Sequence, residues 1–336
     1  MKISVFRNFV SAIALSSAVA VVAMTSAGAQ ETIRIADFLP PTHTFYTCSV
    51  EQWVEQIEAT AADKITINYM GGGTVVGATE ILDGVRQGIA DMGVMVVDYW
   101  PDRFNLASFS SLPYVFPDPV KGTAILRELM KGEMGANFRA QGIEPVMILL
   151  TTPRQISLSN KEISSLDGIQ GLKLRANGWE AKTVEALGAT VVSIPPAEVA
   201  TSQSTGIIDG STQTYYGMPG WGLVDVTDQA VELRGYAHTL VVLGASLDKW
   251  NAWPQEVKDA LTAVSLDIEN KWHDCQIGKD QEVIDQLTAN GAKFYRLTDE
   301  ELATAKEKTK SVLDAWLAET GEGGTKVMAE FEAATK

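Results

Sequence analysis

From about residue 31 onward, segments with a strand-like spacing of hydrophobic residues alternate with segments that have a helix-like spacing. Apolar side chains occur at every second position over residues 32–36, 65–69 and 92–96, and this spacing predicts three strands. Apolar residues three and four apart predict a helix from about residue 44 to 57 and another over residues 81–89. The order strand, helix, strand, helix, strand indicates an α/β sheet of the parallel type with helices on its faces.

The same succession returns after residue 150. Residues 172–176 and 190–194 are predicted strands, residues 179–187 are a predicted helix, and a further helix follows Pro195-Pro196. The chain therefore repeats one architecture in its second half.

The C-terminal part is predicted to be mostly helical. From residue 254 to about 290, apolar residues keep a helical spacing that fits one or two long helices spanning both halves. Thr298 and Glu301 form a capping box, which predicts a helix that runs to about residue 319.

Two short motifs mark corresponding places in the two halves. G-I-A-D at 88–91 and G-I-I-D at 206–209 each follow a predicted helix and precede a strand. The motif is also a common helix-to-strand junction, so it agrees with duplication without proving it. Length is the stronger argument, because 336 residues exceed what one hydrophobic core usually holds, and this predicts two lobes.

The first residues predict export. Lys2 and Arg7 precede an apolar stretch over residues 9–24, and A-G-A at 27–29 supplies a cleavage site, as in a secretory signal peptide. We expect cleavage after Ala29 and a periplasmic mature chain. No later segment is long and apolar enough to suggest direct membrane insertion.

The charge of the chain narrows the choice of partners. The net charge of −15 becomes −17 once Lys2 and Arg7 are removed, and so acidic a protein is not expected to bind nucleic acid or anionic membranes. A small anion would also be repelled at long range. An anion site must therefore concentrate arginine and backbone N–H groups locally.

The sequence contains none of the common motifs of hydrolases or nucleotide-binding enzymes. G-x-S-x-G, H-E-x-x-H and a Walker loop are absent, and His43, His238 and His273 have no recognisable partner motif. The glycine-rich residues 71–77 miss the dinucleotide-binding spacing. We expect no catalytic residue, no cofactor and no metal site.

The chain has two cysteines, Cys48 and Cys275. In an oxidising compartment they can form one disulfide, although two separate buried thiols are nearly as compatible with the sequence. A bridge, if present, should join the first helix to a long C-terminal helix within one lobe, because a bridge between lobes would obstruct their closure.

Arg175 is the leading candidate for a ligand contact. It lies at the end of the strand predicted over residues 172–176, just before a helix that Asn177 is expected to cap. In open α/β sheets ligands bind at this end of the strands, where free N–H groups and the helix dipole favour an anion. The guanidinium fork matches a carboxylate. An ion pair with a neighbouring Asp or Glu at the surface is an equally good interpretation of the local sequence.

Several motifs in a fixed order carry a resemblance to a known family. They include G-L-K-L-R at 171–175, E-A-L-G-A at 185–189, P-P-A-E-V at 195–199, T-G-I-I-D-G at 205–210, and, outside this stretch, Gly71-Gly72, G-I-A-D-M-G-V at 88–94 and W-x-x-W-P at 250–254. Together they span nearly the whole mature chain. The sequence resembles the extracytoplasmic solute-binding subunit of TRAP transporters, the DctP family.

The resemblance implies two α/β lobes that close over a small organic acid, braced by a long helix. It assigns the carboxylate clamp to Arg175 and a second, less uniform arginine to Arg154. The family usually continues its D-G with Gln-Glu-Asn, whose Asn reaches the ligand. Ser211, Thr212 and Gln213 stand here instead, and Gln213 can supply the amide.

Aromatic residues near these motifs suggest a ligand larger or flatter than succinate. The candidates for ligand contacts are Trp179, Tyr215, Phe45 and Trp100, with Tyr46, Tyr99, Tyr216 and Trp221 beside them. Aromatic residues at helical spacing more often belong to a core, so each remains a separate hypothesis.

The sequence thus predicts a two-lobed periplasmic binding protein of α/β class. Residues 30–152 plus 241–280 are assigned to lobe I, and residues 153–240 plus 281–336 to lobe II. Its expected function is to capture a small organic acid and deliver it to the integral membrane subunits of a TRAP transporter. The alternatives are a binding component of another importer or of a sensor, and a secreted α/β enzyme.

Overall fold

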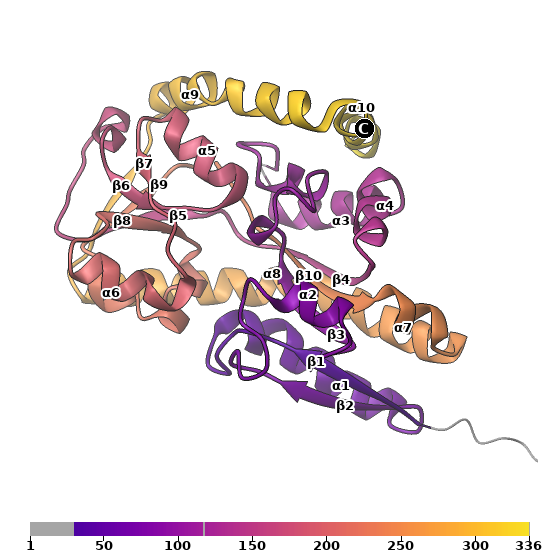
Figure 1. Ribbon diagram of the computed structural model, residues 1–336. Helices are drawn as coiled ribbons and strands as arrows, with labels where there is room; N and C mark the ends of the chain where they lie inside the picture. The colour runs from indigo at the N-terminus through magenta and orange to yellow at the C-terminus, as the bar shows by residue number, and fades with distance from the viewer. Residues whose placement is uncertain (1–29, 117, 336) are drawn as a thin grey trace, which may run out of the picture.

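The computed structural model describes residues 30–116 and 118–335, so the predicted signal peptide, residues 1–29, lies outside the described residues. Two β-sheets, each flanked by helices, form two lobes (Figure 1). The predicted two-lobed α/β fold is confirmed.

The first sheet has the strand order β2-β1-β3-β10-β4. Its strands are β1 (Glu31–Ala36), β2 (Ile65–Met70), β3 (Met92–Val96), β4 (Ile143–Leu150) and β10 (Leu240–Ser246). β1 is parallel to β2 and β3, as predicted, whereas β10 is antiparallel to both of its neighbours. The sheet is mixed because β10 comes back from the second lobe.

The second sheet has the order β11-β9-β5-β8-β6-β7. Its strands are β5 (Gln155–Leu158), β6 (Lys173–Arg175), β7 (Thr190–Val191), β8 (Gly210–Gln213), β9 (Gln229–Glu232) and β11 (Lys293–Arg296). β7 is shorter than the predicted residues 190–194, since the chain turns at Pro195 and Pro196. The β4–β5 and β9–β10 connections carry the chain between the two sheets.

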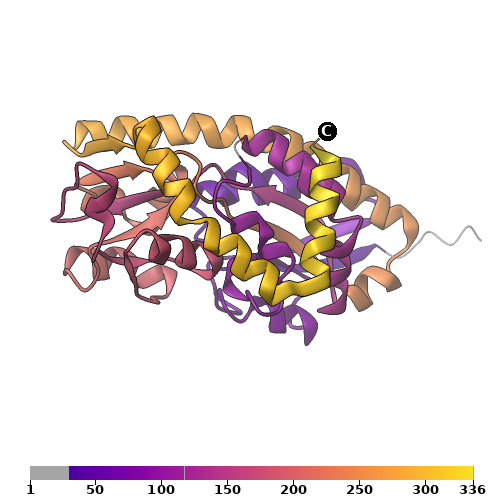
Figure 2. The same cartoon turned by 90° about the horizontal axis from the view of Figure 1, so that it is seen from above.

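One long helix braces both lobes. α8 (Gln255–Ala289) is a single helix of 35 residues, which settles the choice between one helix and two. Its first part buries Leu261 and Trp272 in the core of the first lobe, and its last turns bury Val283 and Leu287 in the second. Figures 1 and 2 show α8 crossing the molecule from one lobe to the other.

The remaining helices pack around the two sheets. They are α1 (Glu51–Ala61), α2 (Ile81–Arg86), α3 (Pro119–Leu129), α4 (Glu133–Ala140), α5 (Gly178–Ala186), α6 (Val199–Ser204), α7 (Leu247–Ala252), α9 (Asp299–Lys308) and α10 (Lys310–Ala334). A one-turn π-helix, Tyr46–Val50, leads directly into α1. α2 is shorter than the predicted helix because Gly88 adopts a φ of 75°, which ends the turn.

The C-terminal helices differ from the sequence prediction in length and in placement. The capping box of Thr298 and Glu301 is present, but α9 ends at Lys308 and α10 continues to Ala334. Figure 2 shows these helices crossing from the second lobe to the first. Trp316 of α10 is fully buried in the first-lobe core, and its Nε1 donates to the Asn105 carbonyl at 2.8 Å. The sequence-based division had grouped this segment with lobe II.

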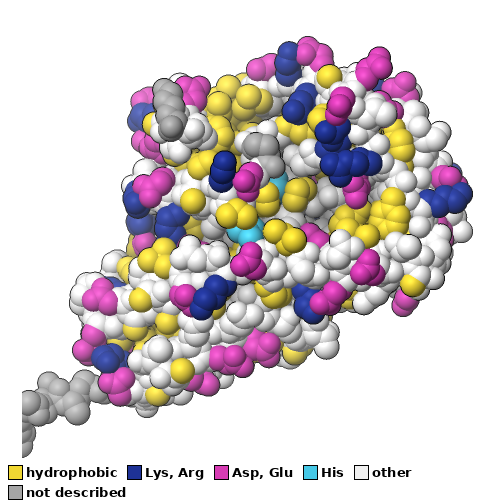
Figure 3. Space-filling model, turned by 180° about the vertical axis from the view of Figure 1, so that it is seen from behind, with side chains coloured by type: hydrophobic (Ala, Val, Ile, Leu, Met, Phe, Trp, Pro, Cys, Tyr) yellow, Lys and Arg dark blue, Asp and Glu magenta, His cyan; other side chains and the backbone are white. Residues whose placement is uncertain are grey.

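The surface carries interspersed charges. On the face shown in Figure 3, Lys and Arg side chains lie among Asp and Glu side chains over both lobes. Among the described residues, no helix is long and apolar enough to span a membrane.

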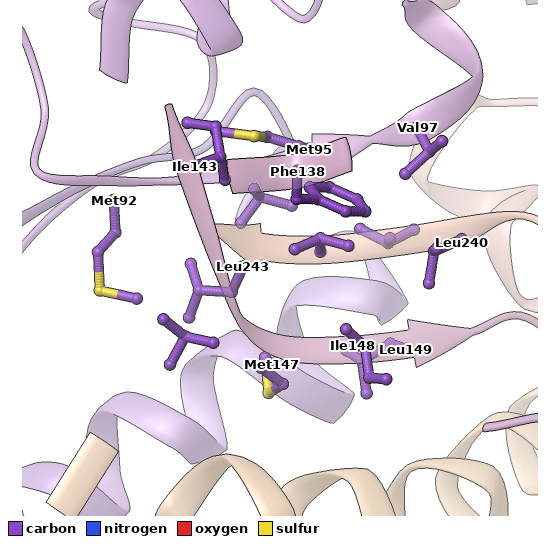
Figure 4. Close-up of a cluster of buried hydrophobic side chains, with 14 of the residues drawn as sticks. Met92, Met95, Val97, Phe138, Ile143, Met147, Ile148, Leu149, Leu240 and Leu243 are labelled. Atoms are coloured by element: carbon purple, nitrogen blue, oxygen red, sulfur yellow. The ribbon is translucent and has the colours of Figure 1, made fainter. Parts of the chain in front are cut away.

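The core of the first lobe lies between its sheet and the surrounding helices. Figure 4 shows Met95 of β3 beside Phe138 of α4. Leu243 of β10 pairs with Met147 of β4, whereas Met95 pairs with Val242, so Leu243 and Met147 lie on the other face of the sheet. Burying such side chains contributes about 1.5–3 kcal/mol each to folding. This core holds the carboxyl end of β3 in place. Asp98 and Tyr99, which come shortly after β3, line the cavity between the lobes.

Cys48 and Cys275 form a disulfide, with 5.9 Å between their Cα atoms. Cys48 lies in the turn before α1 and Cys275 in α8, and both pack against the core of the first lobe. The bridge therefore joins the first helical segment to the long helix within one lobe, as predicted.

Candidate functional site

A cavity lies between the two lobes, where strands of both sheets end. Its lining comprises Phe38, Leu39, His43, Phe45, Val96, Asp98, Tyr99, Thr151, Arg154, Thr239 and Val241 from the first lobe and the connections, and Arg175, Asn177, Pro196, Val199, Gln213, Thr214, Tyr216 and Trp221 from the second. A wider groove leads outward between residues 72–80 and 193–197. Carboxyl ends of strands at a crevice are where open α/β folds bind ligands.

Arg175 ends β6 and is only 4% exposed. Its Nε donates to the Ile194 carbonyl at 3.2 Å, and its two terminal nitrogens lie 2.9 and 3.0 Å from the side-chain oxygen of Asn177 in the amide orientation that satisfies both groups. Asn177 occupies the N-cap position of α5 but makes no capping hydrogen bond, so its side chain serves Arg175 instead. Lys173, on the same strand, is exposed.

No described Asp or Glu forms an ion pair with Arg175. The predicted alternative, a surface ion pair, therefore does not describe this side chain. A buried guanidinium without a carboxylate partner is costly, and an anionic ligand would offset that cost.

Arg154 lines the same cavity but already has an anionic partner. Its Nε lies 2.8 Å from Oε1 of Glu180, and its terminal nitrogens donate to Thr239 and to the Thr212 carbonyl. Glu180 also accepts a hydrogen bond from the Tyr236 hydroxyl at 2.6 Å. Arg154 thus belongs to a buried network of hydrogen bonds and charges, whereas Arg175 has no carboxylate partner among the described residues.

His43 adds no positive charge to the cavity at neutral pH. Its Nδ1 accepts a hydrogen bond from the backbone N–H of Phe45 at 3.0 Å, and burial lowers its pKa to about 4. Asp98, by contrast, has a pKa that burial raises to about 7. The only described cation of the lining that lacks a carboxylate partner is therefore Arg175.

Four of the seven predicted site residues come together. Arg175, Arg154, Gln213 and Phe45 all line the cavity. Gln213 ends β8, and its side-chain oxygen accepts from the backbone N–H of Thr214 at 3.1 Å.

The other three predicted residues lie outside the lining. Trp179 is 6% exposed and packs in the first-lobe core, because the first turn of α5 faces that lobe. Tyr215 points into a second-lobe core, with its hydroxyl donating to Glu232. Trp100 donates its Nε1 proton to the Thr79 carbonyl beside the groove.

The aromatic lining comes partly from residues that the sequence did not single out. Phe38 follows β1 and stacks on Trp221 with ring centroids 6.4 Å apart and planes inclined by 12°. His43 lies 5.3 Å from the same indole. A Cβ on Gly220 would come within 2.3 Å of the His43 ring, so only glycine allows this approach of the two lobes.

Asp98 was also missed by sequence reasoning. It lies two residues after the end of β3 and lines the cavity with an exposure of 5%. The available signal was a carboxylate placed shortly after a fully apolar strand, at the edge where ligands bind. Among the described residues, no group of three or more His, Cys, Asp or Glu side chains could hold a metal ion.

The profile of the bacterial extracellular solute-binding proteins, family 7 (DctP), matches residues 35–320 of this chain. The chain belongs to the DctP family. The resemblance drawn from its motifs is therefore confirmed, and the family consists of periplasmic solute-binding proteins rather than enzymes.

Known DctP proteins and related structures agree with the fold. The ectoine-binding periplasmic protein TeaA of Halomonas elongata is 21% identical over 282 residues, which is 81% of each chain. A TRAP solute-binding protein of Rhodoferax ferrireducens in complex with benzoate superposes with a TM-score of 0.84 at 18% identity, covering 91% of this chain and 97% of that one. A marine metagenome TRAP protein specific for aromatic acids, bound to 3-hydroxybenzoate, gives 0.83 at 20% identity, covering 91% and 98%.

Proposed function

We propose that this protein captures a small organic acid in the periplasm and delivers it to the integral membrane subunits of a TRAP transporter. The signal peptide would direct export and would be cleaved after Ala29. Arg175 would hold the ligand carboxylate, and closure of residues 30–152 plus 241–280 against the rest of the chain would enclose it.

The single observation that carries the proposal is the state of Arg175. Its guanidinium is buried between the lobes and has a neutral amide, but no described carboxylate, as its partner. Water is largely excluded there, so hydrogen bonds to a ligand carboxylate would be stronger than at the surface. Arg154, Gln213 and Phe45 line the same space and are proposed to complete the contacts.

The dimensions and lining of the cavity support a small ligand with an apolar or flat body. The cavity volume is about 70 Å³, room for roughly five to seven water-sized groups at about 10–15 Å³ each. Phe38, Tyr99 and Trp221 contribute aromatic side chains to this lining. We therefore expect a planar acid to bind more tightly than succinate.

A thermal-shift screen of the purified mature protein tests this function. The probes are benzoate, mandelate, orotate, galacturonate and succinate, with benzamide and benzyl alcohol as uncharged controls. An acid present at 100 times its dissociation constant should add about 2.7 kcal/mol to the free energy of unfolding. Stabilisation by the uncharged controls alone would contradict the proposal, and so would chemical conversion of the bound acid.

Substitutions of two tryptophans distinguish a residue of the cavity lining from a residue of the hydrophobic core. Trp221→Ala should weaken binding of the best acid at least fivefold and change the melting temperature little, because Trp221 is only partly buried at the mouth of the cavity. Trp179→Ala should lower the free energy of unfolding by about 3–5 kcal/mol, as expected for a core aromatic, and leave the affinity of the folded protein nearly unchanged. Calorimetric titration and melting curves of both variants measure this difference, and the reverse pattern would contradict the assignment.

A further inference from the structure

Asp98 occupies an unusual position for a carboxylic acid. It lies at the carboxyl end of β3 in the first lobe and lines the cavity, yet it is 5% exposed. The Ser111 hydroxyl donates to its Oδ1 at 2.5 Å, and the Thr239 hydroxyl is also close enough to lower the Asp98 pKa, but no further donor of the described residues reaches Oδ2. One carboxylate oxygen is therefore held in place, and the other is available to a ligand.

The position of Asp98 is fixed from the opposite lobe as well. Gly178, the first residue of α5, adopts a φ of 50°, and a Cβ added there would lie 3.2 Å from both Cβ and Oδ1 of Asp98. The N-terminus of α5 thus closes over this carboxyl group. A hydrogen bond formed inside such an enclosure competes with little water.

The charges around the cavity leave Asp98 without a cation of its own. Arg154 lines the same cavity, but its Nε lies 2.8 Å from Oε1 of Glu180, and His43 is neutral at neutral pH. Burial raises the Asp98 pKa, and Glu180 raises it further, whereas the Ser111 hydroxyl, Arg154 and the Thr239 hydroxyl lower it. A ligand with a carboxylate alone would match Arg175 but would offer no hydrogen bond to Asp98.

We propose that Asp98 is a second recognition point and selects acids that carry a hydrogen-bond donor, a hydroxyl or an ammonium group, on the part of the molecule directed toward the first lobe. The inference rests on the proposed function, since Arg175 must hold the carboxylate. The ligand would then bridge the lobes, with its carboxylate on Arg175 of the second and its donor on Asp98 of the first. An acid without the donor desolvates Asp98 Oδ2 without giving it a hydrogen bond, and this penalty discriminates against that acid.

Two trios of probes of nearly equal shape test this selection. Pentanoate, 4-hydroxybutyrate and 4-aminobutyrate differ only by methyl, hydroxyl or ammonium at one position. In the planar trio of 3-methylbenzoate, 3-hydroxybenzoate and 3-aminobenzoate, the amino group is a neutral donor. Calorimetric titration should show that, in the trio that binds, a donor-bearing acid binds at least tenfold more tightly than its methyl analogue. Equal or tighter binding of the methyl analogue would overturn the proposal.

Two substitutions locate the selection at Asp98. Asp98→Leu keeps the side-chain shape without an acceptor and should reduce the preference for the donor to less than threefold. Asp98→Asn keeps a neutral acceptor and should lose mainly the preference for the ammonium group. If the wild-type preference persists in both variants, the donor is recognised elsewhere and the proposal fails.

Asp37→Asn is the matched control. Asp37 is also a buried carboxyl at the end of a strand, with a pKa raised to about 7 by burial, but its oxygens accept from Tyr69 and from the Leu39 N–H and it does not line the cavity. This variant should keep the wild-type preference. If no probe of either trio and no acid of the wider screen binds wild-type protein, the carboxylate-capture function itself fails, a result distinct from equal binding within a trio.

Discussion

Arg175→Ala should abolish high-affinity binding of the acid while leaving the unliganded fold nearly intact. Charge-assisted hydrogen bonds contribute about 1.5–3 kcal/mol each, and a carboxylate held by the guanidinium fork has two, so the loss should be a hundredfold or more. Stability should change little because Arg175 forms no ion pair with a described carboxylate. Calorimetric titration with the best acid, together with melting curves without ligand, measures both effects.

Two companion variants make the Arg175 result specific. Arg175→Lys should recover little affinity, since an ammonium group keeps the charge but cannot present two parallel donors. Arg154→Ala should melt much earlier than Arg175→Ala, because it leaves Glu180 buried at 2% exposure without its cation, a loss of about 3–5 kcal/mol. Near-normal affinity in Arg175→Ala, or a large drop in its melting temperature, would refute the clamp.

The sequence predicted those features that local pattern determines. Alternation placed β1, β2 and β3 within a residue or two, and Thr298 with Glu301 located the start of α9. Arg175 could be chosen because its position at a strand end, beside a helix start, has a physical meaning before any contact is known. The motif order then supplied the family, which the profile match confirmed.

The site residues that sequence reasoning misplaced depend on contacts between lobes. A helical pattern shows that Trp179 is apolar on one face of α5, but not that this face meets the core of the other lobe. Asp98 resembles an ordinary surface carboxylate until Gly178 closes over it. Phe38 follows β1 without any periodic signal and acquires a role only by stacking on Trp221, which is 183 positions later in the chain.

The contacts of the C-terminal helix α10 with the first lobe also could not be predicted from local sequence. α10 has a helical pattern that predicts its existence, yet nothing local indicates which lobe its apolar face will contact. Trp316 and Val327 pack on the first lobe, while α9 starts on the second. The C-terminal helices therefore link the two lobes a second time, in addition to α8.

Removing the disulfide should have the opposite effect from Arg175→Ala, with a large loss of stability and little loss of affinity. The bond joins residues 227 positions apart, and in the chain-entropy description closing so long a loop is worth about 5 kcal/mol, a large share of the roughly 5–15 kcal/mol by which proteins are stable. The Cys48→Ala, Cys275→Ala double variant should therefore melt roughly 10 °C or more below wild type. Alanine avoids burying a hydroxyl at the position of Cys48, which is 2% exposed.

Affinity should stay within threefold of wild type, because the bridge lies inside the first lobe and neither cysteine lines the cavity. Wild-type protein treated with a reducing agent is the natural control and should melt at the temperature of the double variant. Such a bond also persists only in an oxidising compartment, in agreement with the proposed export. Two free thiols found by mass spectrometry of unreduced protein would show that the disulfide is absent. A double variant as stable as wild type would show that the bond does not stabilise the fold and that packing alone holds the first helical segment against α8.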